Sequence, residues 1–273
     1  MKKIRKNILL SLALFAGLTA FGQQDTASMI TDFNKVMAFS VQPYLHYKAA
    51  MKMSSTPIIQ AEDTLSTESE FYKNLNNICF RNSLGEMFIA DSLFIEIDKR
   101  HKKITLSRID ENTLKKMNVL PLNSKEMREL FKQRYTISRN GSPGSMNKLN
   151  FSSKQSQDST MSVVLNIGLQ YSVKDYLPEV IEMSIDMKQQ LSGDDIQQMI
   201  AEDPASKQMV HTENGTDYLK RTQKVTITFG DIDNTEFSVA KMPNWKENIN
   251  YNLSTGELTP TGIYSDYEII KNF

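Results

Sequence analysis

Apolar and polar residues alternate with a period of two along most of the chain after Tyr44. In the first such stretch, Tyr47, Ala49, Met51 and Met53 alternate with mainly polar neighbours. That spacing indicates a strand with one face buried and the other in water, as in antiparallel sheets. The same reasoning predicts further strands at about 70–80, 86–91, 93–98, 103–108, 161–171, 180–187 and 219–229, with a last strand in the tail.

Three segments show a helical period instead. Residues 27–39 carry apolar side chains at i, i+3/i+4 and i+7, the spacing of a short amphipathic helix. Near 123–135, Asn123 with Glu126 three residues later fits a capping box, and an apolar stripe follows. A third, short helix is predicted over 192–201. The whole pattern predicts an α+β fold, with a curved, mostly antiparallel, half-barrel-like sheet and a few packed helices.

The linkers between these elements give no sign of a second domain. Residues 55–68 form a polar interruption, and residues 99–102 form a turn that joins two short strands as a hairpin. No repeat and no internal shift of composition divides the chain. We therefore expect a single β-rich domain over residues 23–273.

The N-terminal residues 1–22 have the composition of a cleaved signal peptide. Met1 to Lys6 holds four cations, residues 8–21 are apolar, and Ala20 and Gly22 supply small residues before a cleavage site. The alternative is an uncleaved anchor, but the apolar run is shorter than the roughly 20 residues of a spanning helix. The residue directly after the cleavage site is Gln23 and not Cys, so the lipid anchor of bacterial lipoproteins is not expected. The sequence predicts a soluble periplasmic or secreted protein of a Gram-negative bacterium, without a transmembrane anchor.

The charge balance limits the partners. The chain has 32 basic and 32 acidic residues, and the signal peptide removes four of the basic ones. A slightly acidic mature chain without a basic block lacks the electrostatic footprint of a nucleic-acid-binding protein. By the same argument it is not expected to bind anionic membrane surfaces.

Candidate catalytic and metal-binding residues are sparse. Cys79 is the single cysteine, so no intrachain disulfide forms, and its place in a predicted strand favours a buried inert thiol over a nucleophile. The three histidines, His46, His101 and His211, lie far apart and lack zinc-ligand spacing. There is no Gly-x-Ser-x-Gly elbow either. No catalytic residue, metal site or cofactor is predicted, although carboxylates brought together only by folding keep a hydrolase open as an alternative.

Short Asp-Ser/Thr pairs suggest a modification. Several resemble the Asp-Ser/Thr-apolar acceptor of general O-glycosylation in one Gram-negative phylum. Thr64 and Ser159, which follow Asp63 and Asp158 in predicted loops, are the best-placed acceptors. The alternative is that both are ordinary turn or strand residues.

The order of elements, a helix, a meander, a helical insertion and a second meander, resembles the LolA/LolB-like periplasmic lipoprotein carriers. The most similar stretch is Phe71–Ile109, where Glu86–Asp91 leads into the hairpin around residues 99–102. In that family a strongly curved sheet wraps around helices and leaves an apolar cavity for acyl chains. The resemblance implies a similar fold and a lipid or lipoprotein as partner.

Fifteen methionines fit such a cavity. Met is flexible and polarizable and is common at adaptable apolar binding surfaces. The predicted lining residues are Met51, Met53, Met127, Met183 and Met187. The alternative is that they fill an ordinary core.

The function predicted from these features is non-catalytic binding of an apolar ligand, a lipid or lipoprotein acyl chain, or of another envelope component. A structural or protein-interaction module of the envelope is the alternative. A hydrolase with a dispersed carboxylate site is a third possibility.

Overall fold

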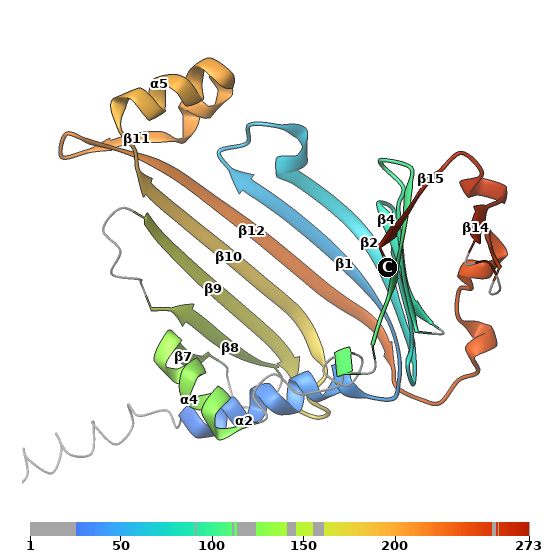
Figure 1. Cartoon of the computed structure of the whole chain (residues 1–273). Coiled ribbons are helices and arrows are strands. Elements are labelled where there is room, and N and C mark those ends of the chain that lie inside the picture. The colour runs from blue at the N-terminus through green and yellow to red at the C-terminus, as the bar shows by residue number, and fades with distance from the viewer. Residues whose placement is uncertain are drawn as a thin grey trace, which may run out of the picture.

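The computed structural model describes residues 26–90, 92–110, 112–113, 124–140, 146–154, 161–252, 255 and 257–272. Within these residues, thirteen strands form one open sheet in the order β15-β6-β5-β4-β3-β2-β1-β12-β10-β9-β8-β7, with β11 paired to β12 (Figure 1). A separate hairpin joins β13 to β14.

The strands of the large sheet are β1 (Tyr44–Thr56), β2 (Thr64–Asn74), β3 (Asn77–Asn82), β4 (Gly85–Ala90), β5 (Leu93–Asp98), β6 (Lys103–Arg108), β7 (Tyr135–Asn140), β8 (Met146–Ser153), β9 (Met161–Ser172), β10 (Pro178–Gln190), β11 (Val210–Glu213), β12 (Thr216–Asp233) and β15 (Glu268–Asn272). The hairpin strands are β13 (Ile249–Asn252) and β14 (Glu257–Pro260). The helices are α2 (Thr26–Met37), α4 (Lys125–Arg134) and α5 (Gly193–Glu202), with short 3₁₀ turns η1 (Ala38–Val41), η2 (Ala61–Asp63), η3 (Pro204–Met209), η4 (Val239–Lys241), η5 (Trp245–Glu247) and η6 (Gly262–Tyr264).

The predicted fold class is confirmed. Neighbouring strands of the large sheet run antiparallel, except that β15 pairs with β6 in parallel. The sheet curves but does not close, because its order ends in β15 on one side and β7 on the other (Figure 1). A few helices pack at its ends, as an α+β fold requires.

Strand register separates the side chains of the central strands into two faces. Successive side chains point to opposite sides of a strand, and directly paired residues share a side. Met51 pairs with Ile227, which pairs with Ile181, so these apolar side chains share one face. Lys52 pairs with Thr226 on the other face. We call them the apolar face and the polar face of the sheet.

The polar-face side of β3–β6 is covered by the C-terminal segment, residues 234–252, 255 and 257–267. In Figure 1 this segment runs along the outside of the strands and ends in β15. Its side chains and those of the strands form one buried cluster: Cys79, Phe88, Leu93, Ile95, Ile97, Ile104, Leu106, Met242, Trp245, Ile249, Leu258 and Tyr264. Cys79 is buried as expected, and burial raises the pKa of its thiol to about 12.

At the other side of the sheet the cover lies on the apolar face. Here α2 and α4 pack over one end of β7–β9 and form a second cluster: Met29, Val36, Leu149, Phe151, Leu169 and Tyr171. Asp32 of α2 fixes the helix to the sheet, because it accepts hydrogen bonds from Arg139 at 2.5 Å and from the Tyr171 hydroxyl at 3.2 Å.

All three predicted helices are present, but the residue that caps one of them differs from the prediction. Residues 27–39 are helical as α2 and the start of η1. The predicted 192–201 helix is α5, and Ser192 and Asp195 form its capping box. For α4, however, the cap is Ser124, whose hydroxyl accepts a hydrogen bond from the Met127 amide. Asn123, expected to cap this helix, lies outside the described residues.

Two strand predictions were wrong in their limits. The polar stretch 55–68 is not one interruption, because β1 continues to Thr56 and β2 begins at Thr64. Thr is enriched in strands, and Ser55 and Thr67 are buried within them although they are polar. The predicted strand 70–80 is two strands, which turn at Leu75 with φ 54°.

Two predictions concern residues outside the part of the chain that the structure describes. The signal peptide, residues 1–22, is outside the described residues, and so is Ser159. Among the helices that are described, none is long and apolar enough to cross a membrane.

The cluster under the C-terminal segment is expected to dominate stability. Ile104 is fully buried in it, whereas Ile263 is 70% exposed. Ile104→Ala should lower the free energy of unfolding by about 2–4 kcal/mol, through lost burial and the cavity left behind. Ile263→Ala, the matched control, should change it by less than about 0.5 kcal/mol. Urea denaturation measures both, and equal effects would show that the cluster is not tightly packed.

Candidate functional site: the open apolar face

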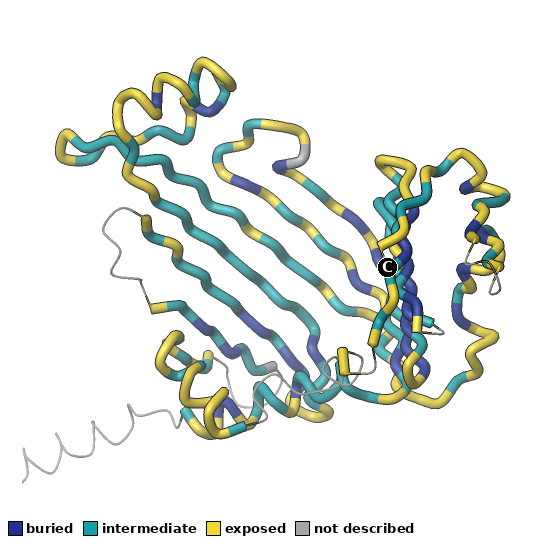
Figure 2. The backbone as a smooth tube through the Cα atoms, viewed as in Figure 1, coloured by how far each residue is buried: buried dark blue, intermediate teal, exposed yellow. Residues whose placement is uncertain are grey.

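The middle of the apolar face has no cover among the described elements. Figure 2 shows these strands at intermediate exposure, in contrast to the buried strands beside the C-terminal segment. The open apolar face, as we define it, consists of Met51, Met53, Val163, Leu165, Met183, Ile185, Met187, Val225 and Ile227. At the margin, Met161 and Val163 are 45% and 38% exposed. A contiguous exposed apolar patch of this kind usually marks a binding surface.

The polar face of the same strands carries hydroxyl, amide and charged groups instead. Ser184 and Asp186 alternate with Met183 and Ile185 along β10. Lys224 and Thr226 alternate with Val225 along β12. This sheet is amphipathic, and no described element covers the apolar side of its central strands.

Aromatic side chains close the open apolar face at the end nearest α2. Phe39 of η1 packs edge-on against Tyr47 and Phe229, with ring centroids 6.0 and 5.8 Å apart. Phe33 of α2 does the same with Phe151, at 5.2 Å. Burial raises the pKa of the Tyr47 hydroxyl to about 12. These rings therefore bound the open apolar face at the end nearest α2.

A groove of about 570 Å³ continues the open apolar face across β1–β5. Its lining includes the apolar side chains of Met53, Leu65, Phe80, Leu84 and Met87. Its polar lining residues are Asn82, Glu86, Glu96, Asp98, Arg100 and His101. The volume lies in the range of small-molecule sites, and the lining combines an apolar part with a polar, charged part.

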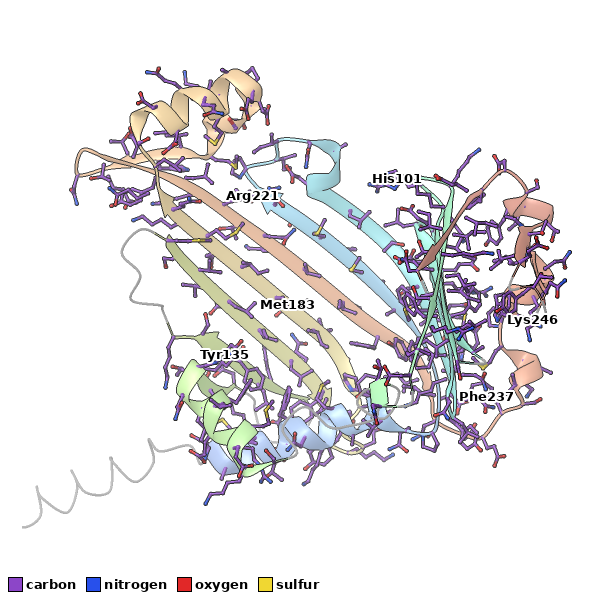
Figure 3. The ribbon with its side chains drawn as sticks, in the orientation of Figure 1. His101, Tyr135, Met183, Arg221, Phe237 and Lys246 are labelled. Carbon is purple, nitrogen blue, oxygen red and sulfur yellow. The ribbon has the colours of Figure 1, made fainter. Side chains whose placement is uncertain are left out.

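An ion pair lies at the α5 end of the face. Arg221 pairs with Asp63 of η2, which is 2% exposed. The Asp63 carboxylate also accepts hydrogen bonds from the amides of Ile59 at 2.7 Å and Gln60 at 3.1 Å. These amides, followed by Arg221, hold the pKa of Asp63 below its ordinary value although burial opposes them. Figure 3 shows Arg221 at this end and Met183 in the middle of the sheet.

Four of the five predicted methionines come together. Met51 and Met53 on β1 and Met183 and Met187 on β10 lie on the open apolar face, with β12 between them. Met127 does not join them, because it lies on α4 and is 46% exposed.

The remaining members of the face were not singled out from the sequence. Ile185, Val225 and Ile227 have the same period of two as the methionines. That period marks them as one-sided, but only the register of β10 and β12 places them beside Met51 and Met183.

The predicted glycosylation sites stay predictions. Thr64 is exposed at the start of β2, with its hydroxyl 3.4 Å from the Ala61 carbonyl. The side chain of its neighbour Asp63 is buried and forms an ion pair with Arg221.

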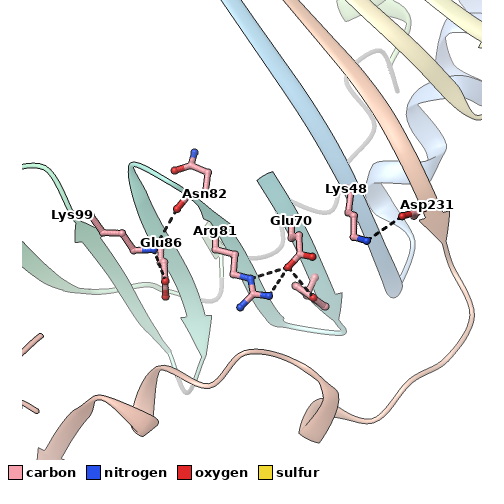
Figure 4. Close-up of polar contacts among 8 residues, drawn as sticks. Lys48, Glu70, Arg81, Asn82, Glu86, Lys99 and Asp231 are labelled. Atoms are coloured by element: carbon pink, nitrogen blue, oxygen red, sulfur yellow. Dashed lines mark hydrogen bonds and ion pairs between the residues drawn. The ribbon is translucent and has the colours of Figure 1, made fainter. Parts of the chain in front are cut away.

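A second groove, of about 780 Å³, lies on the polar face. Register places Lys48, Glu70, Arg81 and Glu86 in one row across four strands (Figure 4). The cations have carboxylate partners: Arg81 lies 2.5 Å from Glu70, and Lys48 and Lys99 contact Asp231 and Glu86 at 3.2 and 2.8 Å. Opposite charges paired across strands stabilise a sheet. We interpret this row as structural.

Metal-ligating side chains do not gather in the described part of the chain. No group of three or more His, Cys, Asp or Glu side chains there could hold a metal ion. His46 stacks on Tyr72 with centroids 4.4 Å apart, and His101 contacts Asp98 at 2.6 Å in the β5–β6 turn. His46 and His101 are thus in separate local contacts.

Comparisons with known proteins add little. No family model matches the chain, and no curated protein sequence matches it. Among solved structures, the chain is similar to the LolA superfamily protein NE2245 from Nitrosomonas europaea, with a TM-score of 0.27 and 6% identity. That similarity covers 77% of this chain and 96% of the other.

The Asp63 contacts predict a pH-dependent contribution to stability. Because the folded-state pKa is lowered, the contribution is present above the unfolded-state value of about 3.9 and is lost as pH falls through the folded-state value. Asp63→Asn should therefore be less stable than the unaltered protein at pH 7, and the gap should narrow below about pH 4. Urea denaturation at several pH values measures the gap. A gap that stays constant with pH would contradict the role of the charge.

Proposed function

We propose that this protein is an exported envelope protein of a Gram-negative bacterium that binds the acyl chain of a lipid or lipoprotein, without catalysis, on the open apolar face. The observation that carries the proposal is the amphipathic central sheet, whose apolar side has no cover among the described elements. The composition of residues 1–22 supports export.

The shape of the surface suits a long, flexible chain. β1 and β10 have 13 residues each, and a strand of that length spans about 43 Å. Val and Ile offer β-branched, stiff contacts, while Met51, Met53, Met183 and Met187 adapt to an irregular ligand. The groove of about 570 Å³ offers a second, more recessed path for part of an acyl chain.

Burial also gives a physical reason for binding. Removing apolar surface from water contributes roughly 25 cal/mol per Å². A bound acyl chain would shield side chains that the fold itself leaves half exposed. The closed aromatic end near Phe39 would limit how far the chain extends along the strands.

The alternative, an envelope protein as partner, would use the same surface. A protein could cover the open apolar face with an amphipathic helix or strand. The two cases differ in what accompanies the purified protein. Native mass spectrometry should show co-purified lipid in the first case and a clean mass in the second.

A pair of variants on β10 tests the acyl-chain proposal directly. Met183→Glu places a carboxylate in the open apolar face, where an apolar ligand would desolvate it. We expect affinity for a fluorescent fatty-acid probe to fall at least about tenfold, a loss of about 1.4 kcal/mol. Titration of probe fluorescence with the purified protein measures it.

Ser184→Glu is the matched control for this test. Ser184 is the next residue of the same strand and lies on the polar face. Its variant should bind the probe within about twofold of the unaltered protein. Failure of the unaltered protein to bind any acyl-chain probe, or equal losses in both variants, would overturn the proposal.

A further inference from the structure

Helix α4 leaves part of its apolar stripe in water. Met127 and Leu130, one turn apart, are each 46% exposed. Neighbours three apart share a helix face. The next residue, Phe131, turns inward instead, where its ring stacks 6.0 Å from Phe33 and packs edge-on 5.4 Å from Phe151. The helix is therefore anchored through Phe131 while two large apolar side chains stay outside.

Basic side chains outnumber acidic ones on and beside this helix. The helix itself carries Lys125, Arg128, Lys132 and Arg134 against Glu126 and Glu129. Folding brings another cation to the helix, Lys154, which directly follows β8. Its ammonium donates a hydrogen bond to the Lys132 carbonyl at 2.8 Å. Glu129 is already paired with Lys132 at 3.0 Å. The local charge is therefore positive, although the chain as a whole is not.

We propose that α4 docks on an anionic lipid membrane, with Met127 and Leu130 inserted at the level of the acyl chains and the surrounding cations against lipid phosphates. An exposed apolar stripe flanked by Lys and Arg is the pattern of an interfacial helix. Cations near an anionic surface are attracted to it. The near-neutral net charge of the chain predicted no binding to anionic membranes. Net charge does not show, however, that folding places Lys154 beside the basic residues of α4.

Two inserted side chains and a few cations give weak, reversible binding. A protein that collects or delivers a lipid needs such reversibility, since firm anchoring would prevent release. Phe131 also connects α4 to the aromatic layer formed with Phe33 and Phe151 beside the open apolar face. The membrane contact would therefore lie next to the proposed ligand surface without being part of it.

Sedimentation with lipid vesicles tests the docking. The purified protein should sediment with vesicles of phosphatidylcholine mixed with phosphatidylglycerol, and less with phosphatidylcholine alone. Added salt should weaken binding, because it screens exposed charges. The double variant Met127→Ser/Leu130→Ser should reduce partitioning about tenfold. Circular dichroism should show an unchanged fold, because neither side chain is buried.

Ile263→Ser provides the control, since Ile263 is 70% exposed but lies in η6 of the C-terminal segment. It should sediment like the unaltered protein. Absence of binding to the anionic vesicles, or equal binding by the double variant, would overturn the docking proposal. Fatty-acid probe binding should be unchanged in the double variant, so this proposal and the acyl-chain proposal fail independently.

Discussion

The structure depends on one constraint: an amphipathic sheet needs apolar cover, and this sheet receives its cover on opposite faces at its two sides. The C-terminal segment covers β3–β6 on the side continuous with the polar face, and Ile95 and Leu106 point into it. Helices α2 and α4 cover β7–β9 on the apolar face, over Leu149 and Phe151. Between them, the strands β1, β12 and β10 belong fully to neither core.

The side of the sheet that carries buried residues therefore changes across β1 and β2. There the polar face is held by paired charges such as Glu70 and Arg81 rather than by apolar packing. On the other face, Met51 and Ile227 remain half buried with no described element over them. This open surface is the one to which we assign the proposed acyl chain, and the recessed groove beside Met53 would suit a ligand of small cross-section.

The sequence predicted the fold class because the period of two along β1, β9, β10 and β12 is long and regular. Alternation assigned Met51 and Met53, and likewise Met183 and Met187, to one side of their own strands, but only the strand register brings the two pairs onto the same face. It could not find the contact between Asp63 and Arg221, which lie 158 residues apart. Nor could it show that the cover changes face, because that depends on which strands are neighbours. Met127 was grouped with the others because helical and strand periodicity both indicate a buried side. In α4, however, Phe131 packs against Phe33 while Met127 is 46% exposed.

The claim that the open apolar face is the ligand surface is tested most directly by photolabelling with a diazirine-bearing fatty acid, followed by peptide mapping. The account predicts labels on β1, β9, β10 and β12 at residues of the apolar face, such as Met51, Leu165, Ile185 and Val225. Labels concentrated on the polar face or on the C-terminal segment, or no labelling above that of an unrelated protein, would contradict it.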